Sequence, residues 1–185
     1  MKKSINTKHT LFYLFTALLV LSCSKEEEDL PELINEEEVI TNVKLVLSAS
    51  GLDTQTIDWA VDQTNSQTIT LKKNTAYEVN ISFLDQSNPS DIEDITEEVE
   101  EEADEHQVFY EFSDLSISYA SSTNDTKDSN GNPVYLKSVW TASSLGSGTV
   151  RAFLIHEPTT KTSSSRDGFG GETDVAIDIP ITVID

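Results

Sequence analysis

Three segments of this 185-residue chain alternate apolar and polar residues with a period of two, and this pattern constrains the fold most. They are VKLVLSAS at 43–50, YEVNISF at 77–83 and VAIDIPITVI at 175–184. Period two gives a strand one buried face and one wet face, as in antiparallel sheets. The side chains expected in the core are Val43, Leu45, Leu47, Tyr77, Val79, Ile81, Phe83, Val175, Ile177, Ile179, Ile181 and Val183.

Further short strands are expected between clusters of Asn, Ser, Gly and Pro, which favour turns. They are residues 56–62, 68–71, 107–112, 115–119, 135–141 and 148–155. Many short strands without intervening helices favour a sandwich over a parallel sheet. We therefore predict an all-β fold, a single antiparallel β-sandwich of immunoglobulin-like size over residues 39–185, with Trp59 and Trp140 in its core.

One acidic segment departs from this pattern, DIEDITEEVEEEADEH at 91–106. Its apolar residues fall three and four positions apart, which is the stripe of a helix, at Ile92, Ile95, Val99 and Ala103. Asp94 and Glu97 resemble a capping box. The segment predicts one short acidic helix of about three turns, crossing between a strand that ends near residue 85 and one that starts near residue 107.

The amino-terminal segment has the layout of an export signal. Lys2 and Lys3 precede an apolar run at 11–21, which is too short to span a bilayer comfortably. The motif VLSC, which ends at Cys23, resembles a bacterial lipobox, in which the signal is cut before a cysteine that then receives lipid. The alternative is an ordinary signal peptide with an incidental cysteine. We predict a lipoprotein signal peptide at 1–22 and an acidic flexible tether at 23–38.

Charge limits the partners of the chain. Its formal net charge is −21, and residues 1–22 contain three lysines and no acid, so the mature chain is more acidic still. Such a surface repels nucleic acid and anionic headgroups, and attachment to the lipid bilayer must come from acyl chains on Cys23. The SKEEED after that cysteine resembles the export tag of Bacteroidetes lipoproteins that reach the outer face of the outer membrane. The alternative is that it forms only a soluble tether.

The carboxyl end of the predicted helix carries acids where a helix prefers cations, at Glu101, Glu102, Asp104 and Glu105. These acids also repel one another, and a bound cation or a protonated His106 would relieve the repulsion. The mature chain has one other histidine, His156, beside Glu157 in FLIHEP. A third polar cluster, GFGGETDV, contains Glu172 and Asp174.

Imidazole and carboxylate ligands suit zinc and similar divalent metals. The candidate ligands are Glu102, His106, His156, Glu157 and Glu172. The alternative is structural, with His106 capping the helix and His156 ending its strand.

Other chemistry has less support in the residues. The loop NDTKDSNGNPV predicts a turn at Asn130–Gly131, because Thr126 and Lys137 stand where an EF-hand calcium loop needs acids. The chain contains no G-x-S-x-G elbow, no phosphate-binding glycine loop and no thiol besides Cys23. We therefore expect a protein that is not an enzyme.

Five segments carry a family resemblance: PELINEEEVIT, EDITEEVEEEADEHQVFY, DSNGNPVYL, RAFLIHEP and GGETDVAIDIPI. Together they resemble a family of small Bacteroidetes all-β lipoproteins, over nearly the whole mature chain. Its members are commonly labelled type 1 periplasmic-binding-fold proteins. The resemblance implies a cell-envelope protein loosely associated with TonB-dependent uptake. His106, Glu157 and Glu172 fall within the shared motifs.

These observations favour a non-enzymatic, surface-exposed lipoprotein of the outer membrane. It would bind a nutrient or a metal ion, or dock on a TonB-dependent uptake receptor. The alternative is a structural or adhesive cell-surface module without a small-molecule ligand, in which the acids only maintain solubility.

Overall fold

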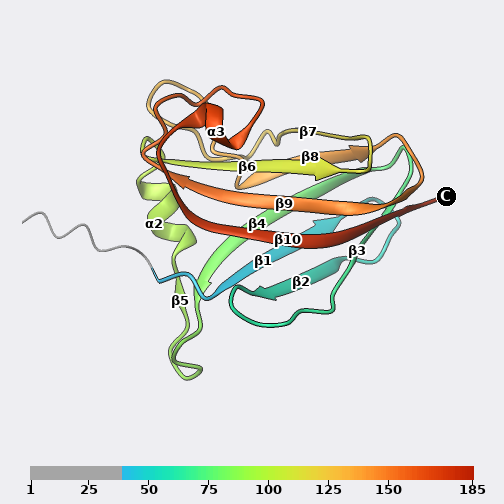
Figure 1. Ribbon diagram of the computed structural model, residues 1–185, viewed down its shortest axis with the longest axis horizontal. Coiled ribbons are helices and arrows are strands. Elements are labelled where there is room, and N and C mark those ends of the chain that lie inside the picture. The colour runs from blue at the N-terminus through green and yellow to red at the C-terminus, as the bar shows by residue number, and fades with distance from the viewer. Residues whose placement is uncertain (1–38) are drawn as a thin grey trace, which may run out of the picture. The chain divides into compact units, whose positions relative to one another are not determined.

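The computed structural model describes residues 39–185, which form two β-sheets packed face to face (Figure 1). The first sheet contains β1 (Asn42–Ser48), β2 (Gln55–Ala60), β4 (Ala76–Asp85), β5 (Glu93–Asp94), β7 (Ile117–Ser121) and β8 (Lys137–Ala142). The second contains β3 (Ile69–Lys72), β6 (His106–Ser113), β9 (Gly146–His156) and β10 (Glu172–Ile184). Two short helices lie between strands: α2 (Thr96–Glu101) connects the first sheet to the second, and α3 (Arg166–Phe169) connects β9 to β10 within the second.

Three predictions lie outside the described residues: the signal peptide at 1–22, the lipid on Cys23 and the tether at 23–38. Within residues 39–185, no helix combines the length and the apolarity needed to cross a membrane.

The strand order confirms the predicted β-sandwich. It runs β2-β1-β4-β8-β7 in the first sheet, with β5 paired to β4, and β3-β10-β9-β6 in the second. Within the described part of the chain every strand pairing is antiparallel except β3 with β10, which is parallel. The chain crosses from β2 in the first sheet to β3 in the second and then returns to β4 in the first.

The core consists of the side chains that the alternation places on one face. The twelve residues expected there, from Val43 to Val183, are between 0% and 5% exposed. Trp140 is fully buried as predicted, and Trp59 is half-buried against the same core. Burial of each large apolar side chain contributes about 1.5–3 kcal/mol, so these faces fix the register of the strands that carry them.

The helix prediction at 91–106 is correct in place and too long. Only Thr96–Glu101 is helical, and turns follow it as far as Glu105. Of the predicted apolar stripe, Ile95, Val99 and Ala103 are buried, whereas Ile92 is 55% exposed. Helix α3 was not predicted.

The start of α2 is set by contacts to β4 instead of a capping box. Glu93 and Asp94 pair with the end of β4 as strand β5, which leaves them outside the helix. Thr96 then binds β4, because its Oγ1 accepts the backbone N–H of Phe83 at 2.9 Å. The Asp94 carboxylate accepts the N–H of Thr96 at 3.1 Å. Ile95 is the N-cap residue of α2, and the helix start has no side-chain capping hydrogen bond.

The loop between β7 and β8 is a turn, as predicted. Gly131 has a φ of +85°, which glycine adopts without strain. Asp128 Oδ1 accepts the N–H groups of Asn130 and Asn132 at 2.9 and 2.7 Å. Asp125 accepts the N–H of Tyr135 at 2.9 Å. These carboxylates therefore hold the backbone of the loop.

Candidate metal centre

The topology of the second sheet brings the two histidines together. Strands β6, β9 and β10 are neighbours and antiparallel, so the start of β6, the end of β9 and the start of β10 lie at one end of the sandwich (Figure 1). His106 opens β6 and is the direct register partner of His156, which closes β9. Their rings stack with centroids 4.8 Å apart and planes 11° from parallel.

Asp174 of β10 completes a group with these histidines. Its Oδ2 lies 4.0 Å from His106 Nε2, and its Oδ1 lies 3.9 Å from His156 Nδ1. The register of β10 on β9 shifts between Thr173 and Val175, so Asp174 is the extra residue of a β-bulge, and bulges re-aim side chains. We call His106, His156 and Asp174 the inner group; their ligand atoms lie within 4.8 Å of one another.

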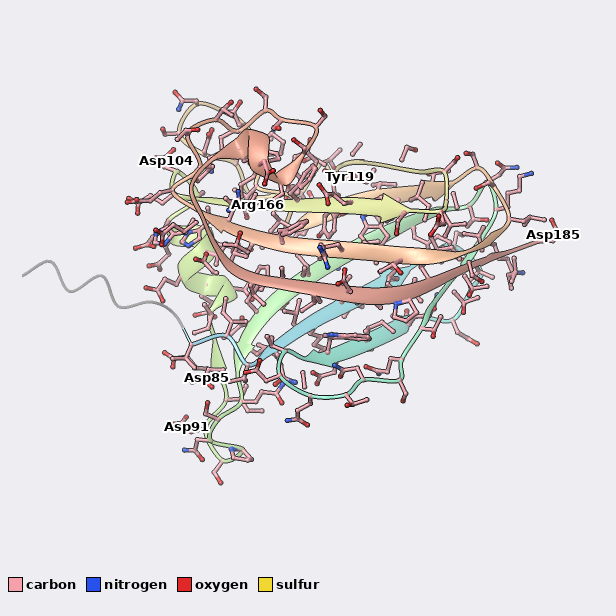
Figure 2. All side chains as sticks on the ribbon, in the orientation of Figure 1. Asp85, Asp91, Asp104, Tyr119, Arg166 and Asp185 are labelled. Carbon is pink, nitrogen blue, oxygen red and sulfur yellow. The ribbon has the colours of Figure 1, made fainter. Side chains whose placement is uncertain are left out.

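Arg166 holds the segment that leads into this bulge. Its guanidinium donates to the carbonyl oxygens of Gly170 and Gly171 at 2.8 and 3.2 Å, and to Thr173 Oγ1 at 2.7 Å. Figure 2 shows Arg166 on α3 and Asp104 after α2 at the same end of the sandwich as the site. Arg166 thus fixes the backbone that precedes Asp174, although it belongs to neither ligand group.

A second set of ligand atoms shares His156. The carboxylates of Glu105 and Glu157 lie within 4.8 Å of each other and of this imidazole, and we call these three residues the outer group. His156 Nε2 is 3.9 Å from Glu105 Oε2. The two acids are also joined through the backbone, because the N–H of Glu157 donates to the carbonyl of Glu105 at 2.7 Å.

Burial holds His106 in its neutral form. Its side chain is 0% exposed, and burial lowers its pKa below the ordinary 6.5; the positive charges of His156 and Lys161 lower this pKa further, against contributions from Glu102 and Glu105. Its Nδ1 lies 3.2 Å from the Glu102 carbonyl oxygen. A carbonyl only accepts, so the neutral ring carries its proton on Nδ1 and turns the Nε2 lone pair toward Asp174.

Lys161 supplies the cation that the acidic helix end lacks. Its ammonium donates to the carbonyl oxygens of Ala103, at 2.9 Å, and His106. Burial lowers the pKa of Lys161, while the charges of Asp128 and Asp104 raise it. Sequence reasoning missed this residue, because it lies 58 positions from Ala103 in a loop with no motif.

The candidate ligands predicted from the sequence are only partly gathered. His106 and His156 meet in the inner group, and Glu157 joins His156 in the outer group. Glu102 and Glu172 belong to neither group. The Glu102 carboxylate lies 4.0 Å from His106 Nδ1, the same nitrogen that faces the backbone carbonyl of Glu102. Glu172 pairs with His156 in the strand register, but the residue is exposed.

Asp174 supplies the carboxylate of the inner group in place of the expected Glu172, and Glu105 contributes to the outer group in place of the expected Glu102. The proposed capping contact of His106 at the helix end and the terminal position of His156 in β9 are both present as well.

The inner group offers three donor atoms near the spacing that a four-coordinate zinc ion needs. Zinc bonds of about 2.0–2.1 Å in a tetrahedron set the ligand atoms roughly 3.3 Å apart. The Asp174 oxygens lie 3.9 and 4.0 Å from the two nitrogens, so binding would draw the carboxylate toward each nitrogen by roughly 0.6 Å. The two stacked rings would also have to turn, because nearly parallel imidazoles do not direct both lone pairs at one ion. Asp174 and His156 have side chains 18% and 22% exposed, which leaves a route for water or a further ligand.

Comparison with known proteins gives no assignment: no family model matches this chain, and no curated protein matches it. The chemical character of the site therefore comes from its own atoms. The inner group has two imidazoles and one carboxylate, and the outer group adds two carboxylates near the imidazole of His156.

The geometry of His106 predicts its tautomer and the direction of its titration. In metal-free protein, the ¹⁵N chemical shifts of the ring should show the proton on Nδ1, because that atom faces the Glu102 carbonyl. A pH titration by NMR should give a pKa below 6.5, because burial disfavours the charged ring. A proton on Nε2, or a pKa at or above 6.5, would contradict the arrangement.

Replacement of Gly171 by alanine should disturb the approach to Asp174. A Cβ at Gly171 would lie 2.2 Å from the His156 carbonyl oxygen and 2.7 Å from that of Glu157, at a φ of +64°. We expect Gly171→Ala to lower the free energy of unfolding in urea by more than about 1 kcal/mol. Gly51→Ala is the matched control, since Gly51 has a φ of +77° and open space around it. An equal loss of unfolding free energy in both variants would show that the close approach of Gly171 to the His156 and Glu157 carbonyls does not affect stability.

Proposed function

We propose that this chain is a non-enzymatic, surface-displayed lipoprotein of the outer membrane whose β-sandwich binds a divalent transition metal such as zinc. The observation that carries the proposal is the convergence of His106, His156 and Asp174 at one end of the second sheet. Two imidazoles and a carboxylate are a common donor set for zinc and its neighbours in the periodic table.

The contacts behind the ligands support the proposal. A metal-binding histidine usually donates its second ring N–H to a carbonyl or a carboxylate, which orients the ring. His106 Nδ1 lies 3.2 Å from the Glu102 carbonyl oxygen, and His156 Nε2 faces the Glu105 carboxylate at 3.9 Å. His106 therefore has such an acceptor at hydrogen-bond distance, and His156 has a carboxylate near its second nitrogen at a longer distance.

Three protein ligands leave a fourth position for water or for a ligand from a partner. That open position suits an ion that is held and then passed on. The resemblance to small Bacteroidetes lipoproteins supports an outer-membrane TonB-dependent receptor as the partner. An acyl anchor on Cys23 would keep the sandwich beside such a receptor in the membrane.

Zinc binding tests the proposal directly. The whole chain, purified without chelator or a metal-binding tag, should contain one equivalent of zinc by elemental analysis and bind it in calorimetry. Asp174→Asn and the double variant His106→Ala, His156→Ala should weaken binding at least about 100-fold, since even residues behind the ligands contribute 10–100-fold. Glu172→Gln is the matched control and should bind like the parent, because Glu172 lies outside both groups.

Two results would count against this assignment. Absence of zinc and of binding heat would favour the structural or adhesive alternative. Loss of binding in Glu172→Gln with retention in Asp174→Asn would show that a different carboxylate holds the ion.

The location of the protein is tested at Cys23. In the bacterium that makes it, the chain should fractionate with the outer membrane, incorporate labelled fatty acid and be cleaved by protease added to intact cells. Cys23→Ser should abolish fatty-acid labelling and membrane retention, because the acidic surface has no attraction for anionic lipid. Ser22→Ala keeps a small residue before the cysteine and should behave like the parent. Membrane retention of Cys23→Ser without its lipid would refute the anchor.

A further inference from the structure

His156 belongs to both ligand groups, and it faces each of them with a different nitrogen. Its Nδ1 lies 3.9 Å from Asp174 Oδ1 in the inner group. Its Nε2 lies 3.9 Å from Glu105 Oε2 in the outer group. The imidazole therefore stands between two carboxylates, one on each side of the ring.

The two groups differ in their access to solvent. His106 of the inner group is fully buried; the Asp174 side chain is 18% exposed, although the residue as a whole is exposed. In the outer group the Glu105 side chain is 57% exposed, and Glu157 is exposed as well. An ion that arrives from water therefore finds more exposed carboxylate at the outer group than at the inner group.

We propose that the outer group is a capture site, where Glu105, Glu157 and His156 Nε2 take a divalent ion from solvent and pass it across the ring to the inner group. This inference rests on the proposed metal-binding function. A neutral imidazole has one lone pair, so His156 ligates one ion at a time, through one nitrogen or the other. The two groups are therefore two positions for a single ion.

The proton balance closes in both positions. With the ion on Nε2, the ring proton sits on Nδ1 and faces the Asp174 carboxylate. With the ion on Nδ1, the proton sits on Nε2 and faces the Glu105 carboxylate. The ring gives one proton to water and takes another from water during the transfer, and its charge is unchanged.

The backbone keeps the outer group assembled before an ion arrives. The bond from the Glu157 N–H to the Glu105 carbonyl joins the residue after β9 to the residue before β6. The pairing of His106 with His156 then continues directly from that bond. The two outer carboxylates are thus positioned by the same register that stacks the histidines.

The rate of zinc uptake tests this route. Stopped-flow competition of the whole chain with a fluorescent zinc indicator should show association slowed at least about fivefold in Glu157→Gln. Dissociation should slow in the same proportion, so that the equilibrium affinity stays within about twofold. Glu98→Gln is the matched control, since it removes the same charge from an exposed position of α2 outside both groups.

The outcomes separate the two proposals. If zinc binds at the inner group and Glu157→Gln takes it up as fast as Glu98→Gln, the capture site is refuted and the metal site stands. Two zinc ions bound tightly at once would also refute it, because one neutral ring cannot ligate both. If the parent binds no zinc, both proposals fall.

Discussion

The antiparallel pairing of β6 with β9 is the interaction on which the site depends. It sets His106 opposite His156, and the core fixes it, because Val108, Tyr110, Val150 and Leu154 of these strands are all buried. A slip of one residue would turn each of these side chains out of the core, at about 1.5–3 kcal/mol apiece. The candidate ligands are therefore positioned by apolar burial several residues away, and they need little rigidity of their own.

The fold could be predicted because period two is a local signal. The run from Val175 to Val183 gives its buried face without reference to any other strand, and the structure confirms that face. The length of the acidic helix could not be predicted in this way. Its start depends on Thr96 binding Phe83, and Lys161 holds the turns that follow its end by binding the Ala103 carbonyl; both contacts join segments that are distant in sequence. Helix periodicity places the apolar stripe but cannot set either boundary.

The sequence could predict which types of residue form the site, but not which particular residues come together there. The two histidines of the predicted mature chain were the natural ligands, because histidine is rare in this sequence. Their approach, however, depends on the register between two strands, and the residues that pair are 50 positions apart. The choice between Glu172 and Asp174 rests on one bulge in β10, which interrupts the alternation that sequence reasoning uses. Nothing in GFGGETDV marks the bulge except its neighbouring glycines, and glycine occurs at many kinds of turn.

The acids after α2 are unfavourable for the helix, since each carboxylate near a helix carboxyl end costs about 0.3–1 kcal/mol. Lys161 offsets part of that cost by binding the carbonyl oxygens there. A purely solvating role would be filled equally well by acids at the amino end of α2, where they would stabilise it. Their position beside the two histidines gives them a different physical effect: Glu102, Glu105 and Glu157 attract cations to the end of the sandwich where the two imidazoles meet. In the proposed function, a local loss of helix stability would accompany a faster encounter of the site with an ion.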